Sequence, residues 1–407
     1  MPVVTLFYGS FCHAEEVAEK IAVNLGYEVV PDLVIMAEAN RRFQIEESKL
    51  ARAMAGKTSV FNKFTHEKER SLACLKVVVA DRLNGDNLLF PGYLGQFIPR
   101  DISHVLRVCL IADLKYRTKL AIAAESLSEK EALKRIHKDD EARVLWVEQL
   151  FNKRDPWAPD LYDMVIPMDK NSVDAAVQLI AANLQKEVLQ MTESSRQALE
   201  DFVLAAEVNL KLAREGHDVA VSAREGNILL TINKHVLMLS SLEEELKKIA
   251  GSVPGVQGVT TKVGAGYYQT DIYRKFDFDM PVPSKVLLVD DEREFVQTLS
   301  ERLQMRAFGS AVVYDGEAAL SVVEEDEPEV MVLDLKMPGV DGLEVLRRVK
   351  KDHPDVEVIV LTGHGSSEIR ARCLEMGACA YLEKPVDLDT LTRTMQDAYR
   401  KKRQQKS

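Results

Sequence analysis

The chain has 407 residues, 46% of them hydrophobic and 29% charged, which is too long for one ordinary domain and provides apolar material for several cores. Its formal net charge of −11 disfavours broad binding to nucleic acid, because a negative field repels phosphates. The five cysteines form no CxxC pair, which argues against a disulfide framework or a zinc site, and the lack of a signal-peptide pattern or an apolar run of about 18 residues predicts a cytoplasmic protein without a membrane span.

Residues 1–190 alternate apolar strands with helical stretches, which is typical of a parallel sheet with helical crossovers. The first apolar run continues through a Gly turn into an amphipathic helix, "VVTLFYGSFCHAEEVAEKIAVNLGY", the layout of a phosphate-binding loop. Further strands are predicted in "LKVVVAD" (75–81), "HVLRVCLIAD" (104–113) and "YDMVIPMD" (162–169).

A smaller α+β block follows at residues 195–265. A long helix ends at Gly216, and two strands joined through Glu225-Gly226 give a hairpin signal. A helix, "SLEEELKKIAGSV", and a last strand, "VQGVTTKV", complete the block. The phrase "VPGVQGV" resembles that of BON-like domains, and the pattern predicts a packing, dimerisation or relay role.

Residues 266–283 mix Gly, Pro and aromatic residues without periodicity and are predicted to be a linker. A clean β/α alternation then runs over residues 284–407. The whole chain therefore reads as an α/β multidomain protein, with a parallel α/β block at each end and a small α+β module between them.

Polar residues follow several strands of the C-terminal block. The strand "KVLLVDDE" ends in Asp290 and Asp291, "VMVLDLKMPGVDG" contains Asp334, "VEVIVLTGHG" contains Thr362, and "AYLEKP" reaches Lys384. Groups at the carboxyl ends of parallel strands converge in one crevice. Converging carboxylates repel unless a hard cation joins them, and Mg²⁺ prefers such oxygen ligands. A carboxylate beside the metal can accept a phosphoryl group, while a hydroxyl and an ammonium group hold its oxygens.

These motifs resemble the receiver domain of two-component response regulators over residues 284–407, which implies a flavodoxin-like (βα)5 fold. The resemblance implies that Asp334 is the phosphoacceptor. It also implies that Asp290, Asp291 and Asp334 hold Mg²⁺ together with the backbone carbonyl of Lys336.

The same resemblance assigns Thr362 as the switch hydroxyl, Lys384 as the partner of the phosphoryl group and Tyr381 as the aromatic switch residue. It also implies a cis bond between Lys384 and Pro385. A sensor histidine kinase or a phosphotransfer protein is the expected phosphodonor.

The N-terminal loop departs from the P-loop pattern G-x-x-x-x-G-K-[ST]. Its first Gly falls on Gly9, but the later positions fall on Ala14, Glu15 and Glu16. Glu15 places an anion where a lysine would contact the phosphates, and acids at a helix start occupy the place of a bound anion. Gly9 and Ser10 remain as candidate nucleotide contacts, and phosphoryl transfer is predicted to be lost.

The N-terminal block nevertheless resembles the cytidylate-kinase-like family of P-loop proteins across about residues 1–190. The phrases "GSFCHAEEVAEKIAVNLGYEVV", "VLRVCLIADLKYRTKLAIA", "SEKEALKRIHKDDEARVLWVEQLF" and "APDLYDMVIPMDKNSVDAAVQLI" carry the resemblance. It implies that Arg117 and Arg143 neutralise a transferring phosphoryl group, with Asp140 near the lid. The alternative is that both arginines lie on solvated helix faces and pair with neighbouring acids.

The sequence as a whole predicts a phosphorelay response regulator in which phosphorylation switches the receiver and its contacts with an inactive kinase-like domain. A downstream protein or a second copy of the chain are candidate output partners, and no basic recognition helix for DNA is apparent. Two alternatives stay open. One is a phosphorylation-controlled nucleotide kinase, which would need Lys20 or Lys57 to reach the phosphates, and the other is a nucleotide-binding sensor without turnover.

Overall fold

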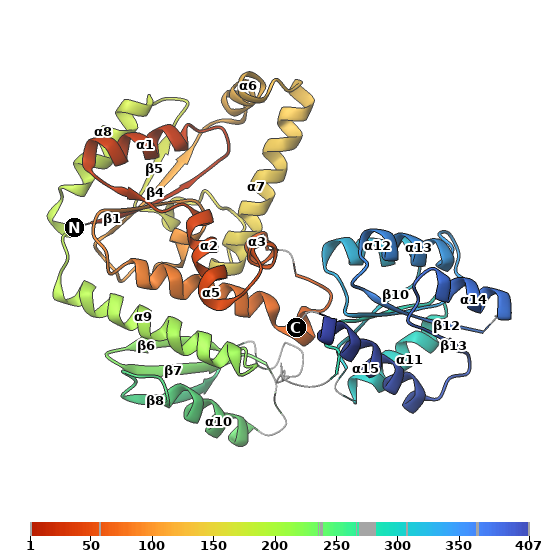
Figure 1. The fold of residues 1–407 in the computed structure, drawn as a ribbon. Helices are drawn as coiled ribbons and strands as arrows, with labels where there is room; N and C mark the ends of the chain where they lie inside the picture. The colour runs from red at the N-terminus through yellow and green to blue at the C-terminus, as the bar shows by residue number, and fades with distance from the viewer. Residues whose placement is uncertain are drawn as a thin grey trace. The chain divides into compact units, whose positions relative to one another are not determined.

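The computed structural model describes residues 2–56, 58–234, 236, 239–265, 267, 282–306, 308–363 and 366–405 (Figure 1). Contacts divide the chain into two compact units. The first contains Met1–Lys57 and Glu67–Tyr273, and the second contains Thr58–His66 and Arg274–Ser407. The predicted linker at 266–283 lies almost entirely outside the described residues.

The first unit contains a five-stranded sheet in the order β2-β3-β1-β4-β5, and every strand pair is parallel. Its strands are β1 (Val3–Tyr8), β2 (Glu28–Val29), β3 (Leu88–Pro91), β4 (Val105–Ile111) and β5 (Met164–Pro167). Alternate residues of β1 enter opposite cores, with Val3 and Phe7 on one face and Val4 and Leu6 on the other. The predicted parallel α/β sheet is confirmed.

Helices cover both faces of this sheet (Figure 1). The helices α1 (Ala14–Leu25) and α8 (Val173–Leu184) supply one core, and α2 (Asp32–Phe43), α3 (Glu47–Met54) and α5 (Glu67–Arg82) supply the other. Residues 1–190 also contain α6 (Leu114–Glu125), α7 (Glu129–Phe151) and the 3-10 turns η1 (Leu94–Phe97), η2 (Pro159–Leu161) and η3 (Glu187–Leu189). Helix α7 begins with a capping box between Ser128 and Glu131.

The prediction of a strand at 75–81 is wrong, because these residues lie inside α5. Val77, Val78 and Val79 are all buried in the first core. A helix that packs against neighbours on several sides shows no polar face, and burial outweighs the weak preference of valine for strands. Its apolar run therefore looked like that of a buried strand.

The middle block has the predicted order of helix, two strands, helix and strand. Its elements are α9 (Glu193–Arg214), β6 (Ala220–Arg224), β7 (Asn227–Ile232), α10 (Leu239–Gly251) and β8 (Gly258–Val263). Strands β6 and β7 are antiparallel, and β8 joins β7 in parallel. Glu225 and Gly226 both have positive φ, as a tight hairpin turn requires, and the Asp201 carboxylate accepts both of their N–H groups.

Helix α9 serves two cores, which explains why the middle block belongs to the first compact unit. Phe202 and Leu210 pack into the core shared with α5, whereas Val208 and Leu212 pack against the three-stranded sheet. A helix with two apolar faces joins both layers into one body.

The second unit contains a parallel five-stranded sheet in the order β10-β9-β11-β12-β13. In chain order this is 2-1-3-4-5, so the predicted flavodoxin-like fold is confirmed. Its strands are β9 (Val286–Val289), β10 (Ser310–Val313), β11 (Val330–Leu333), β12 (Glu357–Thr362) and β13 (Ala380–Glu383). Its helices are α4 (Asn62–Thr65), α11 (Arg293–Gln304), α12 (Gly316–Glu325), α13 (Gly342–Asp352), α14 (Ser367–Glu375) and α15 (Leu388–Gln405).

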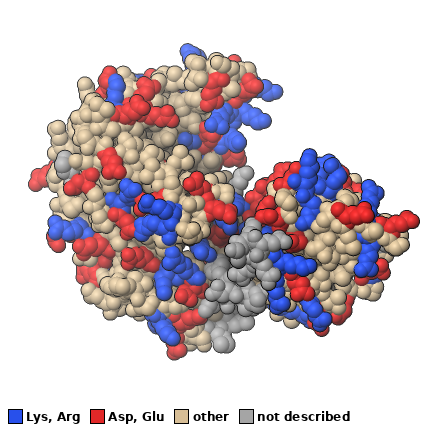
Figure 2. Space-filling model, viewed as in Figure 1, with Lys and Arg blue, Asp and Glu red and all other residues tan. Residues whose placement is uncertain are grey.

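The inner strands β9, β11 and β12 are almost wholly buried, as expected for a parallel sheet with helices on both faces, whereas the edge strands β10 and β13 are partly exposed. The Lys384–Pro385 bond is cis, as predicted. Acidic and basic side chains are interspersed on the visible face of each unit (Figure 2). Within the described part of the chain, no helix combines the length and the apolarity needed to cross a bilayer.

Candidate functional site

The acids Asp290, Asp291 and Asp334 meet at the carboxyl edge of the second sheet. Strands β9 and β11 are neighbours with Val289 opposite Leu333, so the residues that follow them are brought together. One oxygen from each carboxylate lies within 4.8 Å of the others, and this is the one such group of potential metal ligands among the described residues. Asp290 and Asp334 are buried, whereas Asp291 is exposed.

Lys384 is the cation closest to these acids. Its Nζ lies 2.7 Å from Asp290 Oδ2 and 3.8 Å from Asp334 Oδ2, and it donates to Glu292 at 3.0 Å. Burial lowers the pKa of Lys384, but its hydrogen bonds to Asp290 and Glu292 and the nearby carboxylate charges outweigh burial, so the pKa is raised overall. Lys384 is therefore a charged donor at this edge.

The backbone orients the two buried acids. Asp334 Oδ1 accepts the N–H of Leu335 at 2.8 Å, and Asp290 Oδ1 accepts the N–H of Glu292 at 2.9 Å. Burial raises the pKa of Asp290 above its usual range despite its hydrogen bonds to Lys384 and to the Glu292 N–H, and the charge of Asp334 adds to the rise. The ionised cluster is thus short of positive charge, and its all-oxygen donor set fits a hard divalent cation such as Mg²⁺.

The other predicted receiver residues lie near the same edge. Thr362 ends β12, the neighbour of β11, and it is 1% exposed. Tyr381 lies on β13 opposite Val360; its side chain is buried, and its hydroxyl has no hydrogen-bond partner within the described part of the protein. Lys336 is exposed, two residues after Asp334 in the loop that leads to α13.

The sequence analysis missed two residues of this edge. Glu292 shares Lys384 with Asp290, but an acid after an acid pair gives no separate signal. Gly342 begins α13 directly against the Asp334 backbone, where an added Cβ would lie 2.3 Å from the Asp334 carbonyl oxygen. The "DG" pair was a usable signal, because only glycine allows so close an approach.

The carboxyl edge of the first sheet carries the degenerate loop. Gly9 follows β1, and an added Cβ would lie 2.7 Å from Ile111 Cδ1 and 3.2 Å from Arg117 Cζ, so close packing favours glycine here. Phe11 and His13 both have positive φ, and His13 pairs with Glu16 at 2.5 Å. The loop and helix α1 line an open cavity of about 620 Å³ to which Glu15 contributes an acid.

The two arginines that were predicted to contact phosphate donate their hydrogen bonds to other groups of the protein. Arg117 is 3% exposed; it donates to Asp140 Oδ1 and Oδ2 at 2.7 and 2.9 Å and to the Ser10 carbonyl at 2.8 Å. Arg143 donates to the carbonyls of Tyr8 at 2.6 Å and Asp139 at 2.8 Å. The alternative reading is half right: Arg117 pairs with an acid, as it expected, but neither arginine lies on a solvated helix face, because both are buried.

Further contacts close the loop. The Ser10 hydroxyl donates to Asp139 at 2.7 Å, and the Asp140 carboxylate accepts two hydrogen bonds from Arg117, the bidentate geometry that a guanidinium group can also offer to a phosphate. Lys20 pairs with Asp174, while Lys57 lies outside the described residues. Acids of the chain itself therefore offset the positive charges of Arg117 and Lys20 at this edge.

Comparison with protein families matches the two ends of the chain separately. Residues 286–396 match the response regulator receiver domain, and residues 3–170 match the cytidylate kinase-like family. Both predicted resemblances are confirmed. The matches leave out residues 195–265, so the BON-like resemblance stays a prediction.

Known relatives match the C-terminal part. The response regulator MprA of Mycolicibacterium vanbaalenii is 35% identical over 120 residues, which are 30% of this chain and 52% of that protein. The probable transcriptional regulator ycf27 of Guillardia theta is 39% identical over 112 residues, 28% of this chain and 44% of that protein. The chain thus spans about half the length of the curated relatives that it matches.

Solved receiver structures match the same part. The signal receiver domain of a LuxO repressor protein from Vibrio parahaemolyticus is 26% identical, with a TM-score of 0.30, covering 31% of this chain and 95% of that one. The receiver domain of the Francisella response regulator 1452 is 29% identical, with a TM-score of 0.28, covering 29% of this chain and 98% of that one.

Proposed function

We propose that the second unit is the input of a two-component signalling protein and accepts a phosphoryl group on Asp334 from a histidine kinase or a phosphotransfer protein. The observation that carries the proposal is the group of acids Asp290, Asp291 and Asp334 within 4.8 Å, with the ammonium group of Lys384 beside them. Such an arrangement suits a carboxylate that must react with an anionic phosphodonor, since Lys384 and a bound Mg²⁺ would offset the repulsion between the two anions.

Asp290, Asp291 and Asp334 would hold Mg²⁺, with the Lys336 carbonyl as a further ligand. Bound Mg²⁺ supplies positive charge that offsets the repulsion between the phosphodonor and the acids. Asp334 attacks the phosphorus through one carboxylate oxygen, the bond from phosphorus to the donor nitrogen breaks, and an acyl phosphate forms. Leu335 N–H orients Asp334 for this attack through its bond to Oδ1.

Lys384 would then exchange its contact with Asp290 for the new phosphoryl oxygens, and Thr362 would donate its hydroxyl to another of them. Tyr381 is suited to respond, because its buried hydroxyl has no hydrogen-bond partner within the described residues. A buried hydroxyl without a partner costs free energy, and a rotamer that gives this hydroxyl a partner would recover that cost. The switch would therefore shift the population of two arrangements at this edge.

We propose further that the cytidylate-kinase-like part of the first unit does not transfer phosphoryl groups and acts as a scaffold. The bidentate pairing of Arg117 with Asp140 supports this proposal, as does Glu15 at the lysine position. A nucleotide would have to displace Asp140 and lie beside Glu15, and both changes cost electrostatic free energy. The nucleotide kinase and the nucleotide sensor remain the alternatives to test.

Intact-mass spectrometry tests the proposed acceptor. The full chain with Mg²⁺ and acetyl phosphate should gain one phosphoryl group, and Asp334→Asn should gain none. Asp397→Asn is the matched control, since Asp397 lies on the exposed part of α15 in the same unit and should leave the uptake unchanged. Equal uptake by Asp334→Asn would refute the proposal.

A further inference from the structure

A short segment from the N-terminal half of the chain belongs to the second unit. Residues 58–66 are part of that unit, whereas the chain on either side, α3 and α5, belongs to the first. Phe61 has no exposed surface and is a member of the apolar core that the strands β9–β13 form with the helices α12, α13 and α14. Phe64 is also buried, and an added Cβ on Gly309 would lie 2.9 Å from its Cβ.

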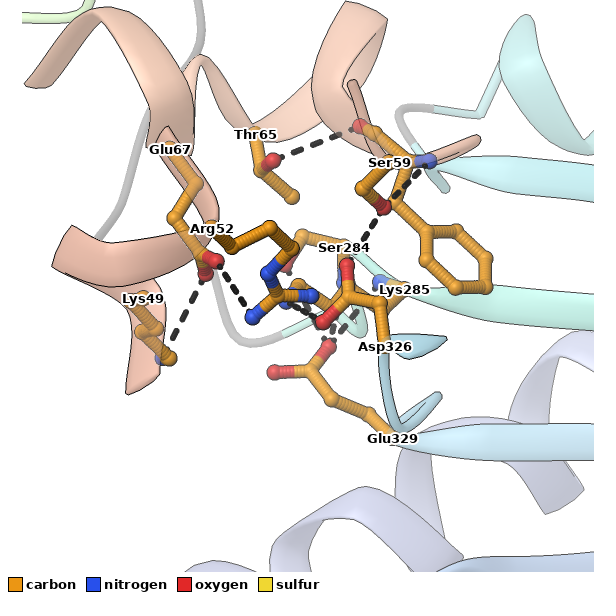
Figure 3. A network of polar contacts seen from close by, with 10 residues as sticks. Lys49, Arg52, Ser59, Thr65, Glu67, Ser284, Lys285, Asp326 and Glu329 are labelled. Atoms are coloured by element: carbon orange, nitrogen blue, oxygen red, sulfur yellow. Dashed lines mark hydrogen bonds and ion pairs between the residues drawn. The ribbon is translucent and has the colours of Figure 1, made fainter. Parts of the chain in front are cut away.

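Polar contacts fix the same segment (Figure 3). The Ser59 hydroxyl donates to Asp326 and accepts the N–H of Phe61 at 3.1 Å. Asp326 also accepts from Lys285 Nζ at 2.8 Å, and both residues of this ion pair are buried. The receiving surface thus offers a charged acceptor, Asp326, to Ser59 and an apolar core to Phe61.

The receiving surface lies at the end of the sheet opposite the acid cluster. Lys285 precedes β9 and Asp326 lies shortly before β11, whereas Asp290 and Asp334 follow these strands. Lys285 and Asp290 are five residues apart across β9, so the two sites lie roughly 16 Å apart along this strand at about 3.3 Å per residue. The segment therefore occupies a surface distinct from the phosphoryl-acceptor site.

The return of the chain to the first unit is also anchored. Glu67 begins α5 and pairs with Lys49 at 3.3 Å and with Arg52 at 3.4 Å, both on α3 (Figure 3). Residues 58–66 thus belong to the second unit, while Glu67, the residue that follows them, is held in the first unit by its ion pairs with α3. It gives the second unit a connection to the rest of the chain in addition to the one through residues 266–283.

We infer that residues 58–66 are an intramolecular docking segment, and that the surface of the second unit around Lys285, Asp326 and the core residues that surround Phe61 is its binding site. The inference goes beyond phosphoryl acceptance and does not depend on it. It makes the receiver a unit that is held by a peptide of the cytidylate-kinase-like region, with Phe61 as the hydrophobic anchor and Ser59 as the polar one.

Hydrogen exchange measured by mass spectrometry on the full chain tests the inference. Phe61→Ala should raise exchange about tenfold to hundredfold in the peptide 58–66 and in receiver peptides covering 284–288 and 323–330, because the buried ring is lost. Val60→Ala is the matched control, since Val60 is 45% exposed, and should change exchange little.

Two results would overturn the docking segment. One is free exchange of 58–66 in the unmodified chain, and the other is a rise in Phe61→Ala that is confined to 58–66. If Phe61→Ala unfolds the whole second unit, Ser59→Ala decides. It leaves Asp326 paired with Lys285 and should raise exchange about tenfold in the same peptides; no rise there would refute the inference.

Discussion

The two parallel sheets of this protein place polar residues at the same kind of edge, yet they arrange charge in opposite ways. In the second unit, Asp290 and Asp334 are buried with one lysine between them, which leaves the cluster short of positive charge. In the first unit, Arg117 is paired with Asp140. The strand order thus brings polar residues together at one edge of each sheet. Whether such an edge can bind a phosphoryl group depends on whether its charged side chains are already paired with one another.

The largest expected effect concerns the metal. Chelation of Mg²⁺ should abolish phosphoryl uptake from acetyl phosphate, and Asp290→Asn should slow uptake about hundredfold or more, because the acids then face the donor without enough positive charge. The rate is measured by intact mass over time. Unchanged rates in both experiments would mean that the acid cluster does not work through a cation.

The second prediction concerns stability in the first unit. Arg117→Ala should lower its free energy of unfolding by about 3–5 kcal/mol, because Asp140 loses the partner of a largely buried pair. Urea unfolding followed by tryptophan fluorescence reports on this unit alone, since both tryptophans, Trp146 and Trp157, belong to it. Arg135→Ala is the control; its side chain is 50% exposed, and the change should cost at most about 1 kcal/mol. Equal losses would contradict a structural role for Arg117.

The third prediction concerns pH. Asp32 begins α2, and its carboxylate accepts the N–H groups of Tyr93 and Leu94. Burial raises its pKa to about 6, more than these bonds lower it. The folded state therefore holds the proton more tightly than the unfolded chain, so this stabilisation is full below about pH 4 and is lost as the pH rises through 6.

Asp32→Asn should flatten that decline between pH 4 and 7 in the same fluorescence assay. The outcome that contradicts it is an identical pH profile for the variant and the unmodified chain. Because the charge of Arg143 acts on Asp32, the result also shows whether an acid beside this arginine changes the free energy of unfolding.

The smallest expected effect is a partial gain of nucleotide binding. Glu15→Lys places a cation in the loop, but Arg117 keeps its ion pair with Asp140 and Arg143 keeps its hydrogen bonds to backbone carbonyls, so ATP affinity should rise no more than about tenfold. Isothermal titration calorimetry compares it with Glu19→Lys, which makes the same charge change one turn along α1, at a residue that does not line the loop cavity. A gain of several orders of magnitude would mean that Glu15 alone had silenced the site.

The sequence predicted the second unit well, because its signals are local. Two four-residue apolar runs, directly followed by Asp290 and by Asp334, predict buried parallel strands. The strand order then brings the two acids together. Thr362 and Lys384 were placed by the same logic. Glu292 was missed because its role depends on where Lys384 reaches in space.

The first unit was harder to predict, because its decisive features are long-range. The valines of α5 have no polar alternation, so only tertiary burial distinguishes this helix from a strand. The pairing of Arg117 with Asp140 crosses from α6 to α7, and residues 58–66 carry no periodic pattern that predicts a place in the other unit. Contacts of this kind depend on packing rather than on spacing in the chain.

The contrast between the two edges is tested most directly in one sample. Protein that has gained one phosphoryl group at Asp334 is titrated with ATP and with CMP in the presence of Mg²⁺, beside the unphosphorylated protein. The account predicts no saturable binding of either nucleotide at micromolar concentrations in either form. Saturable micromolar binding, or a phosphoryl group that is still gained by Asp334→Asn, would contradict it.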